Sequence, residues 1–238
     1  MAESETVKRF YKDVSVGEAD GGFHVLLDTR PVKTPRRAPQ TVPTRTLAEA
    51  LAAEWAAQGE TIDPASFRLR DHADYAIDIV GNERTETIAK LLGFGETDTL
   101  CYRAEPGEEM FRRQEAQWEP LLKAVEAREG FRFERVSGII HRAQPVDTMA
   151  RLAIRLATLD NFTLAGLFAL VSLSASLCVG LAALEPEADI DELFALAELE
   201  EAFQAEQWGR DAEAEARTKK RAEDFAAAAE FLKLSRRG

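Results

Sequence analysis

The residues of this chain whose types and spacing could do chemistry are the carboxylates of residues 185–216. Twelve aspartates and glutamates lie there against one basic residue, a formal charge of −11 in a 238-residue chain of net charge −12. Neighbouring carboxylates such as Glu200 and Glu201 are groups that general acid–base catalysis and hard metal ions use. They occupy consecutive positions of a predicted helix among many other acids, so a solvated face is the simpler interpretation. A metal-dependent hydrolase that uses this segment is the alternative function.

No second set of residues completes a catalytic site. The three histidines, His24, His72 and His141, show no paired-ligand spacing, and the two cysteines, Cys101 and Cys178, lie far apart. The sequence also contains no nucleophile-elbow, P-loop or dinucleotide-binding glycine motif. The sequence therefore gives no positive case for catalysis and indicates no metal or cofactor site, and an enzymatic function stays open at this point.

The acidic segment also contains a large aromatic residue, which raises the possibility of a binding surface. Between residues 199 and 217, a predicted helix rich in acid reaches Trp208 at a glycine, and more acid follows. Aromatic residues beside charge are common at binding hot spots. Composition alone favours a simpler alternative, in which Phe203 and Trp208 anchor the helix end to the core. The net acidity argues against nucleic-acid binding and for a partner with a basic surface.

The elements that must position these residues begin with a small β region over residues 7–43. Asp20-Gly21-Gly22 predicts a turn, and residues 23–27 predict a strand. Prolines at every fourth position restrict the segment 31–43 to edge strands and rigid connections. Thr46-Leu47-Ala48-Glu49 is a capping-box sequence that opens a helix, and Trp55 is expected in its core-facing stripe.

From residue 71 onward the pattern predicts one helix after another. We expect a helix from Pro106 that Pro120 kinks or divides and that Gly130 ends, and β-prone stretches at 97–102 and 131–140. The fold class is therefore α+β, with a β-rich N-terminal domain over 1–70 followed by a larger all-α C-terminal domain over 71–238. Whether 97–102 returns to the N-terminal sheet is left open.

Residues 161–184 form an uncharged stretch of 24 positions in a chain that is 30% charged. Its length would suffice to span a membrane, and it could equally form a buried helix or a broken helix pair. Ser172, Ser174 and Ser176 make it less apolar than a typical span, and no aromatic belt or basic flank marks its ends. We therefore expect it in the core of the helical domain, with no membrane insertion.

The N-terminus shows neither a signal peptide nor the acid-poor composition of a transit peptide, and two distant cysteines suit a reducing compartment. These features predict a cytoplasmic bacterial protein, or a protein of the mitochondrial matrix if this is a eukaryotic chain without its presequence.

Three segments together resemble one family. They are LDTRPVKTP at 27–35, AEWAAQ at 53–58 and EQWG at 206–209, with further matches at Trp118-Glu119-Pro120 and Glu200-Glu201-Ala202-Phe203-Gln204. The sequence is similar to the assembly chaperones of the ATP synthase F1 α subunit, which occur in mitochondria and α-proteobacteria.

The resemblance implies a non-enzymatic chaperone, a small β-rich domain followed by a helical domain, and the free F1 α subunit as partner. Such a chaperone would prevent self-association of the α subunit until the β subunit replaces it. We expect a monomer that binds no nucleic acid. The expected partner-binding residues are Glu200, Glu201, Gln204, Trp208 and Asp211, with Arg30 and Lys33 of the proline-rich segment as a second candidate contact.

Overall fold

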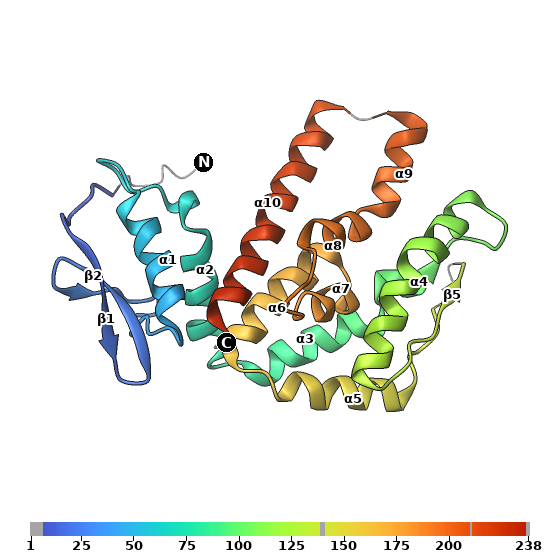
Figure 1. Cartoon of the computed structure of the whole chain (residues 1–238), viewed down its shortest axis with the longest axis horizontal. Helices are drawn as coiled ribbons and strands as arrows, with labels where there is room; N and C mark the ends of the chain where they lie inside the picture. Colours follow the sequence, from blue (N-terminus) through green and yellow to red (C-terminus); the bar gives the residue numbers. More distant parts are fainter. Residues whose placement is uncertain (1–6, 139–140, 210, 237–238) are drawn as a thin grey trace. The chain divides into compact units, whose positions relative to one another are not determined.

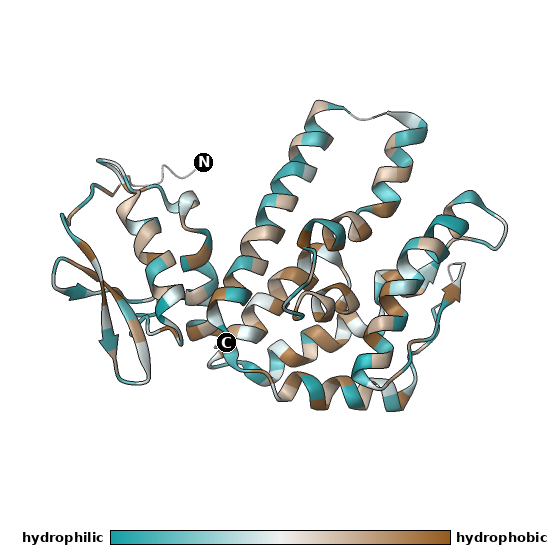
Figure 2. Ribbon diagram, viewed as in Figure 1, coloured by the Kyte–Doolittle hydropathy of each residue, from teal (hydrophilic) through white to brown (hydrophobic). Residues whose placement is uncertain are grey.

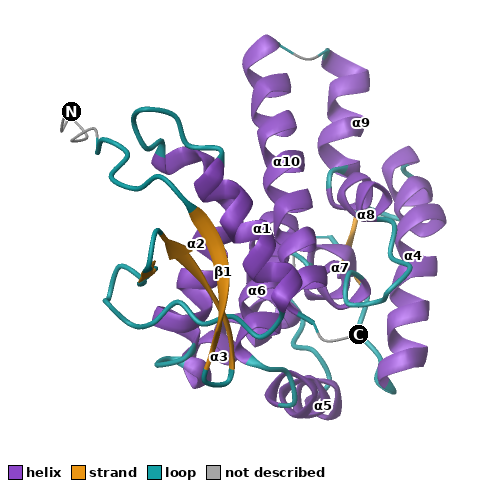
Figure 3. Cartoon of the chain, turned by 60° about the vertical axis from the view of Figure 1, so that its left-hand side comes forward, coloured by secondary structure: helices purple, strands orange, loops and turns teal. Residues whose placement is uncertain are grey.

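The computed structural model describes residues 7–138, 141–209 and 211–236, and it has a small sheet followed by many helices (Figure 1). In Figure 3 the strands are orange and the helices, which make up most of the chain, are purple. The predicted α+β class is confirmed. Arg210, Ile139 and Ile140 lie outside the described residues, as do residues 1–6, on which the expectation about a leader peptide partly rests.

The chain forms two compact units. Unit 1 comprises Met1–Arg84, Asn161–Gly166 and Glu230–Gly238, and unit 2 comprises Thr85–Asp160 and Leu167–Ala229. Three helices, α3 (Arg84–Glu96), α6 (Asn161–Ser174) and α10 (Ala212–Ser235), contribute residues to both units. The expected domain border at residue 70 stays a prediction, and the first border between the units lies at Arg84.

Unit 1 is built on an antiparallel sheet of β1 (Val14–Ala19), β2 (Gly22–Leu27) and β3 (Arg30–Pro31), in that order. Asp20-Gly21 makes the predicted turn, and Gly21 takes the positive φ of 82° that such a two-residue hairpin requires. Helix α1 (Arg45–Ala56) packs on β1 and β2 with Leu47, Leu51 and Trp55 buried, as predicted for Trp55.

The N-cap of α1 differs from the prediction. Thr44, not Thr46, caps the helix, because its hydroxyl oxygen accepts a hydrogen bond from the backbone N–H of Leu47 at 3.2 Å. The hydroxyl of Thr44 also donates to the backbone oxygen of Leu234, near the end of α10. The Thr46 hydroxyl also donates to this oxygen, at 3.4 Å, but Thr46 lies inside the helix, whereas Thr44 has the extended backbone of an N-cap residue.

The rest of unit 1 holds the proline-rich segment in place. Helix α2 (Arg68–Tyr75) continues into a π-helical turn, η2 (Ala76–Val80), whose Asp78 is buried. Asp78 accepts hydrogen bonds from the Thr34 hydroxyl at 2.7 Å and from the backbone N–H of Arg36 at 3.0 Å. An isolated bridge pairs Lys33 with Pro39. The segment is therefore a fixed connection, as its prolines predict.

Unit 1 also contains the short 3-10 helix η1 (Pro64–Ser66), and unit 2 contains the remaining elements. They are η3 (Thr99–Cys101), β4 (Tyr102–Arg103), α4 (Glu109–Glu129), β5 (Val136–Ser137), α5 (Val146–Ala157), α7 (Leu177–Ala182), α8 (Ile190–Ala197) and α9 (Leu199–Trp208). The stretch 97–102 does not return to the N-terminal sheet, because β4 pairs in parallel with β5. Within 131–140, only Val136–Ser137 forms a strand among the described residues.

Helix α4 is one continuous helix of 21 residues, although Pro120 lies within it. Pro120 is on the exposed side, where solvent can reach the carbonyl oxygen of Ala116 that the missing N–H leaves unbonded. Of the two predicted outcomes, a kink or a division at Pro120, the division is therefore wrong. The helix starts at Glu109 rather than at Pro106, and Gly130 ends it in a left-handed conformation, as predicted.

The uncharged stretch 161–184 forms a broken helix pair, α6 and α7, separated at Ala175, which has a positive φ of 50°. Leu167, Leu170 and Leu177 are completely buried, and the ribbon of α6 and α7 is among the most hydrophobic parts of the chain (Figure 2). Among the described residues, no helix is long and apolar enough to cross a membrane. The predicted core role of the stretch is confirmed.

Candidate functional site

Helices α9 and α10 run side by side (Figures 1 and 3). Side chains of both helices line a groove of about 510 Å³. On α9, Glu201, Gln204, Ala205 and Trp208 face the groove at spacings of three and four residues, which places them on one side of the helix. Asp211 and Ala214 line it from the other wall. All of these residues belong to unit 2.

The base of the groove is firmly held. Glu198 and Arg221 form an ion pair at 2.8 Å, and Arg221 also donates to the backbone oxygen of Leu173 at 2.8 Å. The rings of Phe194 on α8 and Phe225 on α10 pack with their centres 5.5 Å apart. The two helices are thus fixed at one end, while most residues toward the other end are exposed.

Helix α4 supports the outer side of α9. Trp118 donates a hydrogen bond from its indole nitrogen to the backbone oxygen of Leu196 at 2.8 Å, just before α9 begins. Arg113 pairs with Glu206 at 2.6 Å and lies 4.8 Å over the ring of Phe203. These contacts set the orientation of α9 about its own axis. Its Phe203 side packs toward α4, and its Trp208 side faces the groove.

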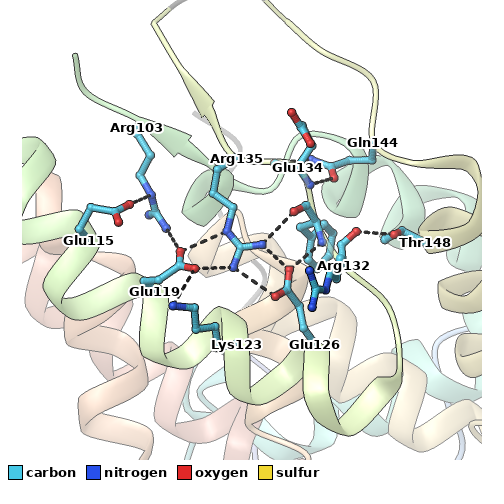
Figure 4. A network of polar contacts seen from close by, with 11 residues as sticks. Arg103, Glu115, Glu119, Lys123, Glu126, Arg132, Glu134, Arg135, Gln144 and Thr148 are labelled. Carbon is cyan, nitrogen blue, oxygen red and sulfur yellow. Dashed lines mark hydrogen bonds and ion pairs between the residues drawn. The ribbon is translucent and has the colours of Figure 1, made fainter. Parts of the chain in front are cut away.

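A network of charged side chains fixes α4 in turn (Figure 4). Arg135 forms ion pairs with Glu119 at 3.0 Å and with Glu126, and the buried Arg103 pairs with Glu119 at 3.1 Å. Burial acts to raise the pKa of Glu119, but its hydrogen bond to Arg135 and the nearby arginine charges outweigh burial and hold this pKa below its ordinary value. The network therefore ties the strand segment around Arg135 to the helix that supports the groove.

The structure brings together four of the seven residues predicted to bind a partner, Glu201, Gln204, Trp208 and Asp211. Trp208 is 80% exposed, so the alternative in which it anchors the helix end to the core is wrong. Phe203 is only half-buried, beneath Arg113.

The other three predicted residues lie elsewhere. Glu200 points toward α4, where its carboxylate accepts a hydrogen bond from the Gln114 amide at 2.7 Å, and burial raises its pKa. Arg30 is exposed on β3 in unit 1. Lys33, also in unit 1, lines a separate groove of about 530 Å³ together with Asp74 and Tyr75.

Sequence analysis missed the residues that make the groove open. Ala202, Ala205 and Ala214 line it with side chains too small to fill the space between the helices. A stripe of alanines beside an exposed tryptophan was visible in the sequence, but alanine is so common in helices that the pattern carries little information.

The described acidic residues are not grouped as metal ligands. Within residues 7–138, 141–209 and 211–236, no three histidine, cysteine, aspartate or glutamate side chains are grouped so that they could hold a metal ion. The metal-dependent hydrolase alternative therefore gains no support from the described part of the chain.

Comparison with known proteins gives a consistent result. A family model described as ATP12 chaperone protein matches residues 8–126. The chain is 28% identical over 214 residues to the mitochondrial protein atp12 of Schizosaccharomyces pombe, covering 85% of this chain and 74% of that protein. The crystal structure of Atp12 from Paracoccus denitrificans shares 37% sequence identity and a TM-score of 0.92, with 97% of this chain and 99% of that chain covered.

A second solved structure extends the comparison. The Agrobacterium tumefaciens protein Atu1473 shares 38% identity and a TM-score of 0.91, with 96% of this chain and 86% of that chain covered. The family model ends at residue 126, before the groove, whereas both solved structures cover nearly the whole chain.

Proposed function

Since the chain belongs to the ATP12 chaperone family, we propose that it is an assembly chaperone of the ATP synthase that binds the free F1 α subunit. The observation that carries the proposal is the family match, together with the likeness of nearly the whole chain to Atp12 of Paracoccus denitrificans. We further propose that the groove between α9 and α10 is part of the binding surface. The compartment expected from the sequence, bacterial cytoplasm or mitochondrial matrix, belongs to the same proposal.

The groove has properties that suit a temporary partner. An unassembled subunit exposes the surface that it will later bury, and such apolar patches promote aggregation. A chaperone must cover that surface with moderate affinity, so that the native neighbour displaces it by mass action. Trp208 offers a large apolar contact, and the exposed carboxylates around it favour fast and selective encounter more than tight binding.

The central test measures aggregation of the α subunit. We expect purified F1 α subunit to aggregate alone and to stay in solution with an equimolar amount of this protein, because the exposed subunit surface is covered. Light scattering records the aggregation, and size-exclusion chromatography shows whether the two proteins elute together. Equal aggregation rates with and without the protein would refute the proposal.

The variant Glu201→Lys/Trp208→Ala tests the groove itself. It reverses one exposed charge and removes the exposed aromatic ring, so binding to the α subunit should weaken about thirtyfold or more, the range of a hot-spot residue. Both side chains are exposed, and the thermal stability should therefore change little. Titration calorimetry or surface plasmon resonance measures the affinity.

Ile154→Ala is the matched control for this variant. Ile154 is 68% exposed on α5 of the same unit, so its removal also deletes a large exposed apolar side chain, but away from the groove. We expect its affinity for the α subunit to equal that of the unsubstituted protein. Unchanged binding by the groove variant, or equal losses in both variants, would place the binding surface elsewhere. Arg30 and Lys33 stay a predicted second contact in unit 1.

A further inference from the structure

The groove between α9 and α10 has the form of a helical bundle that lacks one helix. Its walls present small side chains at helical spacing, Ala202 and Ala205 on α9 and Ala214 and Thr218 on α10. Two helices in contact normally fill such a space with interlocking side chains. Here the space of about 510 Å³ is open, and its size is within the range of pockets that bind ligands.

The backbone of the walls decides what kind of segment can enter. Both walls are α-helices, whose interior N–H and C=O groups are bonded within the helix. Along the helical part of these walls an extended peptide would find no backbone partners, in contrast to a peptide that adds to the edge of a sheet. A helical segment satisfies its own backbone and needs only side-chain contacts. The groove therefore suits a helix.

The charge of the groove limits which helix can bind. Among the residues that the structure describes, both arginines that line the groove form ion pairs, Arg217 with Glu213 at 2.6 Å and Arg221 with Glu198 at 2.8 Å. Glu201 and Asp211 are exposed, and neither has an ion-pair partner among the residues that the structure describes. The carboxylates of Glu201 and Asp211 therefore lie, without an ion-pair partner in the described part of the chain, beside the alanine-lined walls and Trp208.

We propose that the groove binds an amphipathic helix of the partner, with bulky apolar residues on the face that enters and Lys or Arg along its borders. Helix α9 has 10 residues, so the bound segment spans about 15 Å, close to three turns. This inference rests on the proposed function, because the helix is taken to belong to the α subunit that the protein protects.

Three designed peptides without aromatic residues test the ligand class on the full chain. The first is an amphipathic helix with leucines on one face and lysines beside them, the second has glutamates in place of the lysines, and the third has a central proline that prevents the helix. Trp208 reports binding, because Trp55 and Trp118 are buried and Trp208 is 80% exposed. We expect only the first peptide to shift the tryptophan emission, with an affinity that falls as salt is added. Equal binding of the second or third peptide would overturn the inference.

A substitution that fills the groove provides a second test of the proposed helix site. Ala214→Leu places a bulky side chain on the wall that α10 forms, and we expect the affinity for the lysine peptide to fall about tenfold or more, since a filled groove forces the ligand out of its site. Ala216→Leu is the matched control, because Ala216 is exposed on the same helix and does not line the groove. Circular dichroism checks that both variants stay helical. Equal effects of the two substitutions would contradict the assignment.

The two proposals fail in different ways. If the protein protects the α subunit but the lysine peptide does not bind, the helix inference is wrong and the chaperone proposal stands. If the lysine peptide binds in the groove but the α subunit aggregates as it does alone, the chaperone proposal is wrong and the ligand class of the groove stands.

Discussion

Asp98→Ala is expected to lower the free energy of unfolding by about 3–5 kcal/mol at neutral pH, because each buried donor that loses its acceptor costs about 1–3 kcal/mol. Asp98 is completely buried, and its carboxylate accepts hydrogen bonds from the Ser176 hydroxyl at 2.8 Å and from the backbone N–H groups of Cys178 at 2.9 Å and Leu100 at 3.0 Å. Alanine would leave all three donors buried without an acceptor. Urea unfolding followed by circular dichroism measures the change, and a loss below about 1 kcal/mol would contradict it.

The position of Asp98 explains why the effect should be large. Its carboxylate holds the point at which α6 and α7 separate, where Ser176 caps α7 by accepting a hydrogen bond from the N–H of Val179 at 3.1 Å. Thr99 fixes the other side of the break, because its backbone N–H donates to the oxygen of Ala175 at 3.2 Å. Without the carboxylate, the positive φ of Ala175 keeps the bond from Thr99 but loses the support on its C-terminal side, where Ser176 and Cys178 are held.

The pH dependence gives a sharper form of the same test. Burial raises the pKa of Asp98 to about 6, above its ordinary value in an unfolded chain. The stability that this group contributes is therefore complete below about pH 4 and falls by about 3 kcal/mol as the pH rises through 6. Asp98→Asn does not titrate, so its stability deficit relative to the unsubstituted protein should be largest near pH 4 and smaller at pH 7.

Comparing the unsubstituted protein with Asp98→Asn isolates the contribution of Asp98 to the pH dependence of stability. Burial also raises the pKa of Asp74 to about 6, but Asp74 is present in both proteins and its contribution cancels. Unfolding free energies measured at several pH values between about 4 and 7 give the deficit directly. A deficit of constant size across this range would mean that Asp98 does not titrate there.

Local sequence patterns were enough to predict those elements that neighbouring residues determine. The turn at Asp20-Gly21 and the end of α4 at Gly130 depend on residues next to one another, and the burial of α6 follows from its lack of charge. The break at Ala175 was beyond such patterns, because Asp98, 78 residues before Ser176, stabilises it. The parallel pairing of β4 with β5 could not be predicted either, because it joins residues that are far apart in the sequence, such as Tyr102 and Val136.

In the candidate site, too, some features follow from the local sequence and others depend on contacts between distant residues. The acidic side chains and Trp208 were visible in the sequence as neighbours in one acidic segment. The rotation of α9 was not, since Gln114, 86 residues before Glu200, takes that carboxylate away from the groove. The groove also requires α10 beside α9, with Ala214 in its first turn and Asp211 just before it. Residue types indicated the chemistry, whereas tertiary contacts determined which residues share a surface.

Leu170→Asn is expected to destabilise unit 2 by about 3–5 kcal/mol. Leu170 is completely buried in α6, so the substitution removes apolar contacts and buries an amide that has no partner there. In a chain of this size the melting temperature should fall by about 10 °C. Differential scanning calorimetry measures the melting temperature and also shows whether the two units unfold together.

Ser172→Asn is the matched control for the core. Ser172 lies two residues from Leu170 on the same helix but is exposed, so the new amide stays in water and stability should change by less than about 0.5 kcal/mol. Leu177, whose side chain packs against Gly95 of α3, gives an independent test on the other side of the break. If Leu170→Asn and Leu177→Asn left the melting temperature unchanged, neither side chain would be buried, and the helix pair could not be the core that fixes the base of the groove.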